Sequence, residues 1–144
     1  MESPVKNERA IALLMASAMV SACDGNKADP HNASQVSRGK AVYLSHCAAC
    51  HGVNLEGQPN WRERRADGKL PAPPHDGKGH TWEHSDRALF EVTKFGFASM
   101  AGTGYATDMR AFKDELRDEE IWAVIAYIKS TWPTRLREKQ SGIK

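Results

Sequence analysis

Three segments of the chain have the hydrophobic periodicity of helices. The clearest is residues 118–132, whose apolar positions recur at i, i+3, i+4 and i+7 and so define one helix face. These positions are Ile121, Val124, Ile125 and Ile128. Acidic residues open the segment and Lys129 lies in its last turn, as the helix dipole favours. Pro133 follows, so we expect this helix to end before it.

Residues 34–50 form the second helical segment. One face of it carries Val36, Gly39, Tyr43 and Cys47. Glycine inside a helix costs about 1 kcal/mol relative to alanine. Gly39 therefore indicates a close crossing with another helix.

The third segment, residues 85–96, predicts a short helix with Ser85 or Asp86 as N-cap and Gly96 at its end. Between the helices, residues 52–84 and 97–112 are rich in glycine and proline and predict loops. Thirty residues of loop are unusual in a compact domain, unless the loop wraps a cofactor that replaces missing core. The fold class expected is all-α, with one domain over residues 35–133.

Outside that domain, the basic residues 134–144 are expected to be a frayed C-terminal tail. At the other end, the apolar run 10–20 follows two basic residues and has the length of a secretory h-region, too short to span a membrane. We predict a signal peptide over residues 1–22 and a polar linker over 23–34. The sequence "VSAC" that ends at Cys23 resembles the lipobox of bacterial lipoproteins, which implies lipidation of Cys23. The alternative is ordinary cleavage that leaves a soluble exported protein.

The overall composition excludes some classes of protein. The net charge of +2 over 144 residues is too small to indicate a nucleic-acid-binding protein. No stretch reaches the roughly 18 consecutive apolar residues that a transmembrane helix needs.

The three cysteines narrow the chemistry further. If Cys23 is lipidated, Cys47 and Cys50 remain as a pair within "CAACH", with His51 next to them. A structural zinc site normally needs four Cys or His ligands in two clusters. A redox dithiol belongs at a strand-to-helix junction, but the surroundings here are helical. Covalent haem attachment is the remaining function of a Cys-x-x-Cys-His motif.

The spacing of this motif suits a single haem. One helical turn can bring Cys47 and Cys50 to the two vinyl groups of a porphyrin and point His51 at the iron. Attachment of this kind takes place outside the cytoplasm, in agreement with the predicted signal peptide. Only one such motif occurs, so we expect one covalently bound haem c with iron.

The second axial ligand is open at this point. The candidates are Met100, Met109, His31, His75, His80 and His84. Spacing alone does not decide between the two methionines of the 97–112 loop. A histidine–methionine pair would raise the reduction potential relative to two histidines. Trp61 and Trp82 are candidates to pack on the haem or to bond a propionate.

From about Val36 to Trp132 the chain resembles class I (mitochondrial-type) monohaem cytochromes c. The resemblance is carried by the haem motif and by "GYATDMRAF" followed by "LRDEEIWAVIAYIKSTWP". It implies a small cytochrome c fold in which long loops wrap the haem, and it implies Met109 as the second axial ligand.

The resemblance also implies a crossing of the N- and C-terminal helices at which Gly39 and Tyr43 meet Val124 and Tyr127. Two residues depart from the family pattern. Arg110 replaces the proline that commonly follows the ligand, and Arg117 replaces a capping serine. The lost cap costs about 1 kcal/mol unless Asp118 takes its place.

These features predict an electron carrier and not an enzyme. It would pass electrons between membrane-associated partners in the periplasm, such as a terminal oxidase or reductase, and a lipid on Cys23 would anchor it. A second possibility is a haem-based gas sensor or small peroxidase, in which Met109 leaves the iron readily. A third is a subunit held permanently in a larger oxidoreductase.

Overall fold

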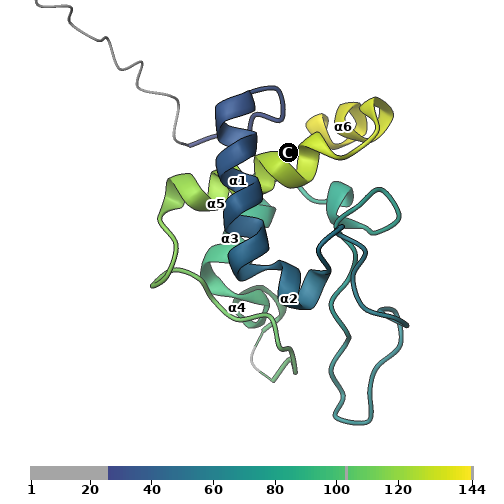
Figure 1. The fold of residues 1–144 in the computed structure, drawn as a ribbon. Coiled ribbons are helices and arrows are strands. Elements are labelled where there is room, and N and C mark those ends of the chain that lie inside the picture. Colours follow the sequence, from purple (N-terminus) through teal and green to yellow (C-terminus); the bar gives the residue numbers. More distant parts are fainter. Residues whose placement is uncertain (1–25, 103, 144) are drawn as a thin grey trace, which may run out of the picture.

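The computed structural model describes residues 26–102 and 104–143, and within them it is helical without strands (Figure 1). The elements are α1 (Ala33–His46), α2 (Ala48–His51), the 3-10 helix η1 (Thr81–Glu83), α3 (Asp86–Phe95), α4 (Phe97–Ala101), α5 (Asp118–Ser130) and α6 (Thr134–Ser141). The all-α prediction is confirmed. The predicted signal peptide and Cys23 lie outside the described residues. None of the described helices has the length and hydropathy needed to cross a bilayer.

Helices α1 and α5 cross at Gly39. A Cβ atom added to Gly39 would lie 1.9 Å from the Ala123 carbonyl oxygen and 3.0 Å from the Tyr127 Cβ. Tyr43, one turn further along α1, is fully buried, and its ring centroid lies 5.5 Å from that of Tyr127. The predicted crossing is therefore present, with Ala123 and not Val124 directly beneath the glycine.

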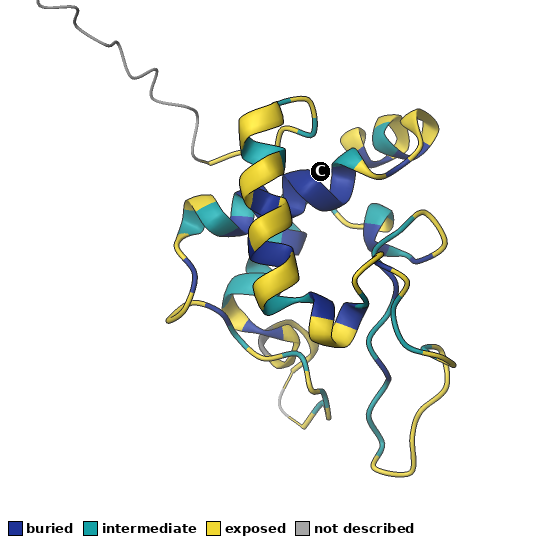
Figure 2. Cartoon of the chain, viewed as in Figure 1, coloured by how far each residue is buried: buried dark blue, intermediate teal, exposed yellow. Residues whose placement is uncertain are grey.

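Helix α5 is the centre of the core. The predicted stripe of isoleucines and valine is buried, but so are Ala123, Ala126 and Tyr127 on other faces. Figure 2 shows α5 largely buried, whereas α1 keeps an exposed outer face. Helix α3 covers another side of α5, where the Phe90 and Trp122 rings stack with centroids 4.3 Å apart.

Local signals predicted the ends of α3 correctly. Ser85 is the N-cap, and its Oγ accepts a hydrogen bond from the Ala88 N–H at 3.3 Å. Gly96 ends the helix with a φ of +82°, a conformation that side chains disfavour. Residues 52–84 are loop up to η1, and the 97–112 loop contains the short helix α4.

The start of α5 is stabilised differently from the expectation. The Glu120 carboxylate accepts hydrogen bonds from the Arg117 N–H at 2.9 Å and from its Nε at 3.3 Å. Asp118 does not take the place of the missing serine, because its carboxylate pairs with Lys94 Nζ at 2.7 Å. Glu120 thus supplies the reciprocal half of a capping box.

The frayed C-terminal tail predicted from the sequence is wrong. Residues 134–141 form α6, which packs against η1. Leu136 and Gln140, one turn apart on the same face, are only 7% and 2% exposed. Gln140 Nε2 donates to Asp86 Oδ1 at 2.6 Å and to the His84 carbonyl at 3.1 Å. The buried leucine and the buried amide hold α6 on the domain. The many charged residues of this segment conceal these two positions in the sequence.

The described part of the predicted linker also packs on the domain. Ala28 is 1% exposed, and its carbonyl accepts a hydrogen bond from Lys129 Nζ at 3.4 Å. Lys129, itself buried, contacts both carboxylate oxygens of Asp86 at 2.7 Å. The chain therefore belongs to the folded domain from Ala28 onward, and Asn32 caps α1.

The helix crossing leads to a stability prediction. At an exposed position inside a helix, substitution of glycine by alanine raises the free energy of unfolding by about 1 kcal/mol. Gly39→Ala is expected to lower it instead by about 1–3 kcal/mol, because the added methyl group would overlap the Ala123 carbonyl. Urea denaturation measures this change. Ser37→Ala, at an exposed position of α1, is the control and should not destabilise the protein. A Gly39→Ala variant as stable as the parent would contradict the close crossing.

Candidate haem-binding site

The Cys-x-x-Cys-His segment folds into one helical turn at the end of α1. The Cys47 N–H donates to the Tyr43 carbonyl at 2.8 Å, which continues α1 into the turn. The N–H groups of Cys50 and His51 both donate to the Cys47 carbonyl, at 3.1 and 2.9 Å. Both cysteines are free thiols; Cys47 is half-buried and Cys50 is exposed. The turn therefore presents two thiols and an imidazole together.

Tyr43 and Gly52 hold the end of this turn. Gly52 has a φ of +82°, and the Tyr43 hydroxyl donates to its carbonyl at 2.8 Å. A Cβ atom at Gly52 would also overlap the Glu56 carboxylate. Because Gly52 follows His51 directly, these contacts restrict where the imidazole lies.

His51 is prepared to act as a metal ligand. Its side chain is buried, and its Nδ1 lies 2.8 Å from the Pro73 carbonyl oxygen. A carbonyl oxygen only accepts, so Nδ1 carries the proton and the Nε2 lone pair is available for iron. Burial lowers the pKa of His51, which favours the neutral form that a metal requires. Sequence reasoning did not find Pro73, whose only signal was the "PAPP" run.

The Cys47 thiol is protonated at neutral pH. Burial, with a smaller contribution from Cys50, raises the pKa of Cys47 to about 11, against an opposing effect of the Arg110 charge. Two free thiols next to an oriented imidazole fit covalent attachment of a haem to Cys47 and Cys50.

The structure brings His75 to the wrong place for a second axial ligand. Its ring stacks on His51 with centroids 4.0 Å apart and an interplanar angle of 23°. If His51 ligates a haem iron, a ring stacked beside it would lie on the same face of the haem and would be unable to ligate the opposite face. The His75 Nδ1 also lies 2.8 Å from Thr81 Oγ1, which holds the ring in place.

The other three histidines considered as axial ligands lie in different surroundings. His80 stacks on Trp61 with centroids 5.3 Å apart, and His84 lies edge-on to His80. His31 is exposed at the start of α1. Within residues 26–102 and 104–143 there is no group of three or more His, Cys, Asp or Glu side chains that could hold a metal ion.

A surface pocket of about 440 Å³ lies beside Pro73, with Trp61, Arg62 and His80 in its lining. The His80 Nδ1 is buried without a hydrogen-bond partner among the described residues. A bound acidic group could satisfy such a nitrogen, and a haem propionate is one such group. Trp82, by contrast, donates its indole N–H to the Gly79 carbonyl at 3.1 Å and so stabilises the loop itself.

The two candidate methionines differ in burial. Met109 is half-buried and packs against the hydrophobic core from the segment between α4 and α5. Met100 lies in α4 and is 49% exposed. Burial thus distinguishes the two residues, which spacing could not.

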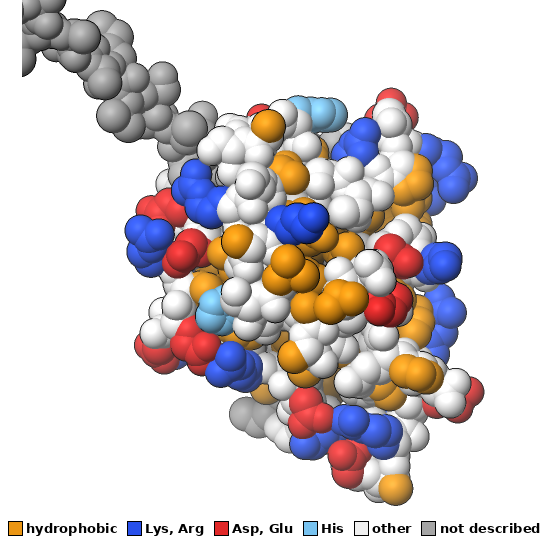
Figure 3. All heavy atoms as spheres, in the orientation of Figure 1, with side chains coloured by type: hydrophobic (Ala, Val, Ile, Leu, Met, Phe, Trp, Pro, Cys, Tyr) orange, Lys and Arg blue, Asp and Glu red, His pale blue; other side chains and the backbone are white. Residues whose placement is uncertain are grey.

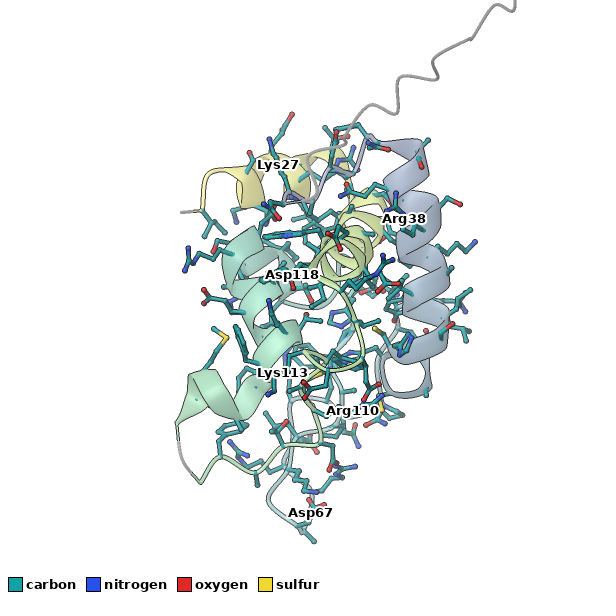
Figure 4. The ribbon with its side chains drawn as sticks, turned by 90° about the vertical axis from the view of Figure 1, so that its left-hand side faces the viewer. Lys27, Arg38, Asp67, Arg110, Lys113 and Asp118 are labelled. Carbon is teal, nitrogen blue, oxygen red and sulfur yellow. The ribbon has the colours of Figure 1, made fainter. Side chains whose placement is uncertain are left out.

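Arg110 points to a partner of its own. Its Nη1 lies 2.5 Å from Glu115 Oε1, and its guanidinium carbon lies 4.8 Å from the Phe112 ring centroid. In Figure 4 it lies between the helical part of the molecule, where Asp118 is labelled, and the loop that carries Asp67. The charge next to Met109 is therefore paired.

The free thiols generate a prediction about attachment. Replacing both Cys47 and Cys50 with alanine should remove covalent haem, because no other described residue offers a free thiol. Acid–acetone extraction followed by haem staining of the denatured chain measures this loss. Ala49→Ser, at the exposed position between them, is the control and should keep the stain. Haem retained by the double variant after extraction would show that attachment is elsewhere.

Comparison with known proteins agrees with this geometry. The family model described as cytochrome c matches residues 36–132, from the first turn of α1 to just beyond α5. Comparisons with curated proteins and with solved structures gave no match. Because the family model covers more than half of the 144 residues, the chain belongs to the cytochrome c family, whose members carry covalently bound haem c.

Proposed function

We propose that this cytochrome c is a single-haem electron carrier, not an enzyme, in which His51 and Met109 occupy both axial positions of the iron. The observation that carries the proposal is the different placement of the candidate ligands. Met109 packs on the core, Met100 is exposed, and His75 stacks beside His51. The cytochrome c family as a whole performs haem-based electron transfer.

In this proposal, Cys47 and Cys50 attach the haem, and the Pro73 carbonyl orients His51 through Nδ1. When bound, haem c supplies a one-electron ferrous–ferric couple. The Met109 thioether would favour ferrous iron and so raise the reduction potential. The buried core around Tyr43 and α5 would keep water from the His51 side.

A sensor or small peroxidase would need Met109 to leave the iron readily. In the sequence, only the positive charge of Arg110 favoured that alternative. The Arg110 guanidinium is engaged by Glu115 and Phe112, which leaves it less able to act on a bound ligand. The electron carrier is therefore the better supported function.

We further propose that the protein is exported and anchored by a lipid on Cys23 to the periplasmic side of a bacterial membrane. Two or more acyl chains give stable anchoring. Ala28 already packs on the domain, so the five residue-to-residue steps from Cys23 to Ala28 span at most roughly 18 Å. The haem domain would then lie close to the membrane and to membrane-bound partners, such as a terminal oxidase or reductase.

The surface suits transient docking of such partners. Figure 3 shows hydrophobic side chains in the middle of the face that carries α1 and α2, with charged side chains mainly around its edge. Leu44 in α1 and Val53 just after α2 are exposed hydrophobic residues. The net charge of +2 is nearly balanced by two haem propionates, so strong electrostatic steering is not expected. Small, weak interfaces are usual for redox partners.

The ligand assignment predicts a difference between two methionine variants. Met109→Ala should lose the weak long-wavelength ferric band that marks methionine–iron ligation, and its ferrous form should bind CO. Met100→Ala, the matched control, should keep the band and should not react with CO. Optical spectra of both oxidation states measure these properties. Loss of the band in Met100→Ala alone would assign the ligand to Met100, and a wild-type spectrum that shifts with CO would favour the sensor or peroxidase.

The anchor predicts a change in location. Cys23→Ser should move the protein from the membrane fraction to the soluble exported fraction and abolish incorporation of labelled fatty acid, because the thiol that carries the lipid is gone. Ser21→Ala keeps a small residue before the cleavage site and is the control. Membrane association that persists in Cys23→Ser without fatty-acid incorporation in the wild type would show that another feature holds the protein there.

A further inference from the structure

We propose that Asp108 is a positioning residue, which Arg65 and Lys69 hold so that Met109 stays on the haem iron. This inference rests on the proposed function, because it needs Met109 as an axial ligand. We call residues 65–69 the clamp turn and residues 104–111 the ligand loop.

The contacts are two ion pairs on one carboxylate. Asp108 Oδ2 lies 2.5 Å from Arg65 Nη2, and Asp108 Oδ1 lies 2.5 Å from Lys69 Nζ. Each oxygen thus has its own cation. The pairs join segments that are 43 and 39 residues apart in the sequence.

The two cations come from one ordered turn. The Arg65 N–H donates to the Lys69 carbonyl, and the Gly68 N–H donates to the Arg65 carbonyl, both at 2.9 Å. Gly68 has a φ of +79°, which glycine adopts without strain. Arg65 also lies 3.7 Å from Asp67. Hydrogen bonds within the clamp turn therefore fix the backbone from which both cations extend, so less freedom is lost when the pairs form.

Asp108 is next to Met109, so a restraint on one acts on the other. Two hydrogen bonds close to Met109 join near neighbours in the sequence: the Met109 N–H donates to Thr107 Oγ1 at 3.0 Å, and the Tyr105 N–H donates to the Gly102 carbonyl at 3.4 Å. Arg110 does not restrict its backbone as a proline would. The pairs with the clamp turn connect the ligand loop to the long loop between α2 and η1, which carries the labelled Asp67 in Figure 4.

The expected effect concerns ligand exchange and not global stability. All three side chains are between one third and about one half exposed, and exposed ion pairs contribute little to the free energy of unfolding. Restraint of one loop instead changes how often Met109 leaves the iron. An external ligand binds only while the methionine is away, so its apparent affinity reports that fraction.

The test is a titration of the ferric holoprotein with imidazole. Loss of the methionine–iron absorption band measures how much imidazole has bound. Asp108→Asn should bind imidazole about tenfold more tightly than the wild type, equivalent to about 1.4 kcal/mol. The double variant Arg65→Gln/Lys69→Gln should behave alike, because it removes the same pairs from the other side. Lys69→Arg keeps the charge and should stay close to the wild type.

Asp114→Asn is the matched control, because it removes an exposed, ion-paired carboxylate that lies outside both the clamp turn and the ligand loop. It should leave imidazole affinity unchanged. In the wild type, 1 M salt should reproduce part of the Asp108→Asn effect. At this concentration the Debye length falls to about 3 Å, which weakens the attraction between exposed charges. This measurement needs no variant and so does not depend on folding of the mutants.

Three results would overturn the inference. Asp108→Asn could bind imidazole like the wild type, or Asp114→Asn could change the affinity as much, or the gain could only parallel a loss of thermal stability. A wild-type spectrum without the methionine–iron band is different: it would reject Met109 ligation and with it the proposed function. The spectrum of the unmodified protein thus separates the two failures.

Discussion

The contact of α1 with α5 at Gly39 determines where the haem-binding turn lies. The absence of a side chain lets the α1 backbone approach the Ala123 carbonyl. One turn later, Tyr43 packs against Tyr127 and donates its hydroxyl hydrogen bond to Gly52. Gly52 follows His51, so a single tyrosine connects the helix crossing to the end of the turn. Wider separation of the helices would move the imidazole away from Pro73.

A buried polar network organises the opposite end of the molecule. Lys129 at the end of α5 pairs with Asp86 at the start of α3, and Gln140 of α6 donates to the same carboxylate. Buried charges are tolerated when each has a partner and the remaining lone pairs are satisfied. Through the bond from Lys129 to Ala28, the network also holds the segment that leads to the proposed lipid anchor. The network thereby connects the chain next to the proposed anchor with the helical core.

The long loop between α2 and η1 depends on scattered hydrogen bonds. Its backbone bonds to itself, as where the His75 N–H donates to the Leu55 carbonyl at 2.8 Å and the Gln58 N–H to the Ala72 carbonyl at 2.9 Å. Through Pro73 it also orients His51. No periodicity describes such contacts, and the loop is therefore where sequence reasoning said least about individual residues.

The sequence by itself determined the features that depend on neighbours a few residues away. Ser85 and Gly96 bound α3, an isoleucine–valine stripe indicates α5, and the spacing of Cys47, Cys50 and His51 selects a haem motif. Tertiary structure decided the rest: α6 is ordered because Leu136 and Gln140 find partners on η1 and α3, and Glu120 caps α5 because Lys94 occupies Asp118. The pairing of Asp108 with Arg65 and Lys69 is of the same kind. Those contacts join residues roughly 20 to 60 positions apart, and only the folded backbone decides which of many similar charges and amides meet.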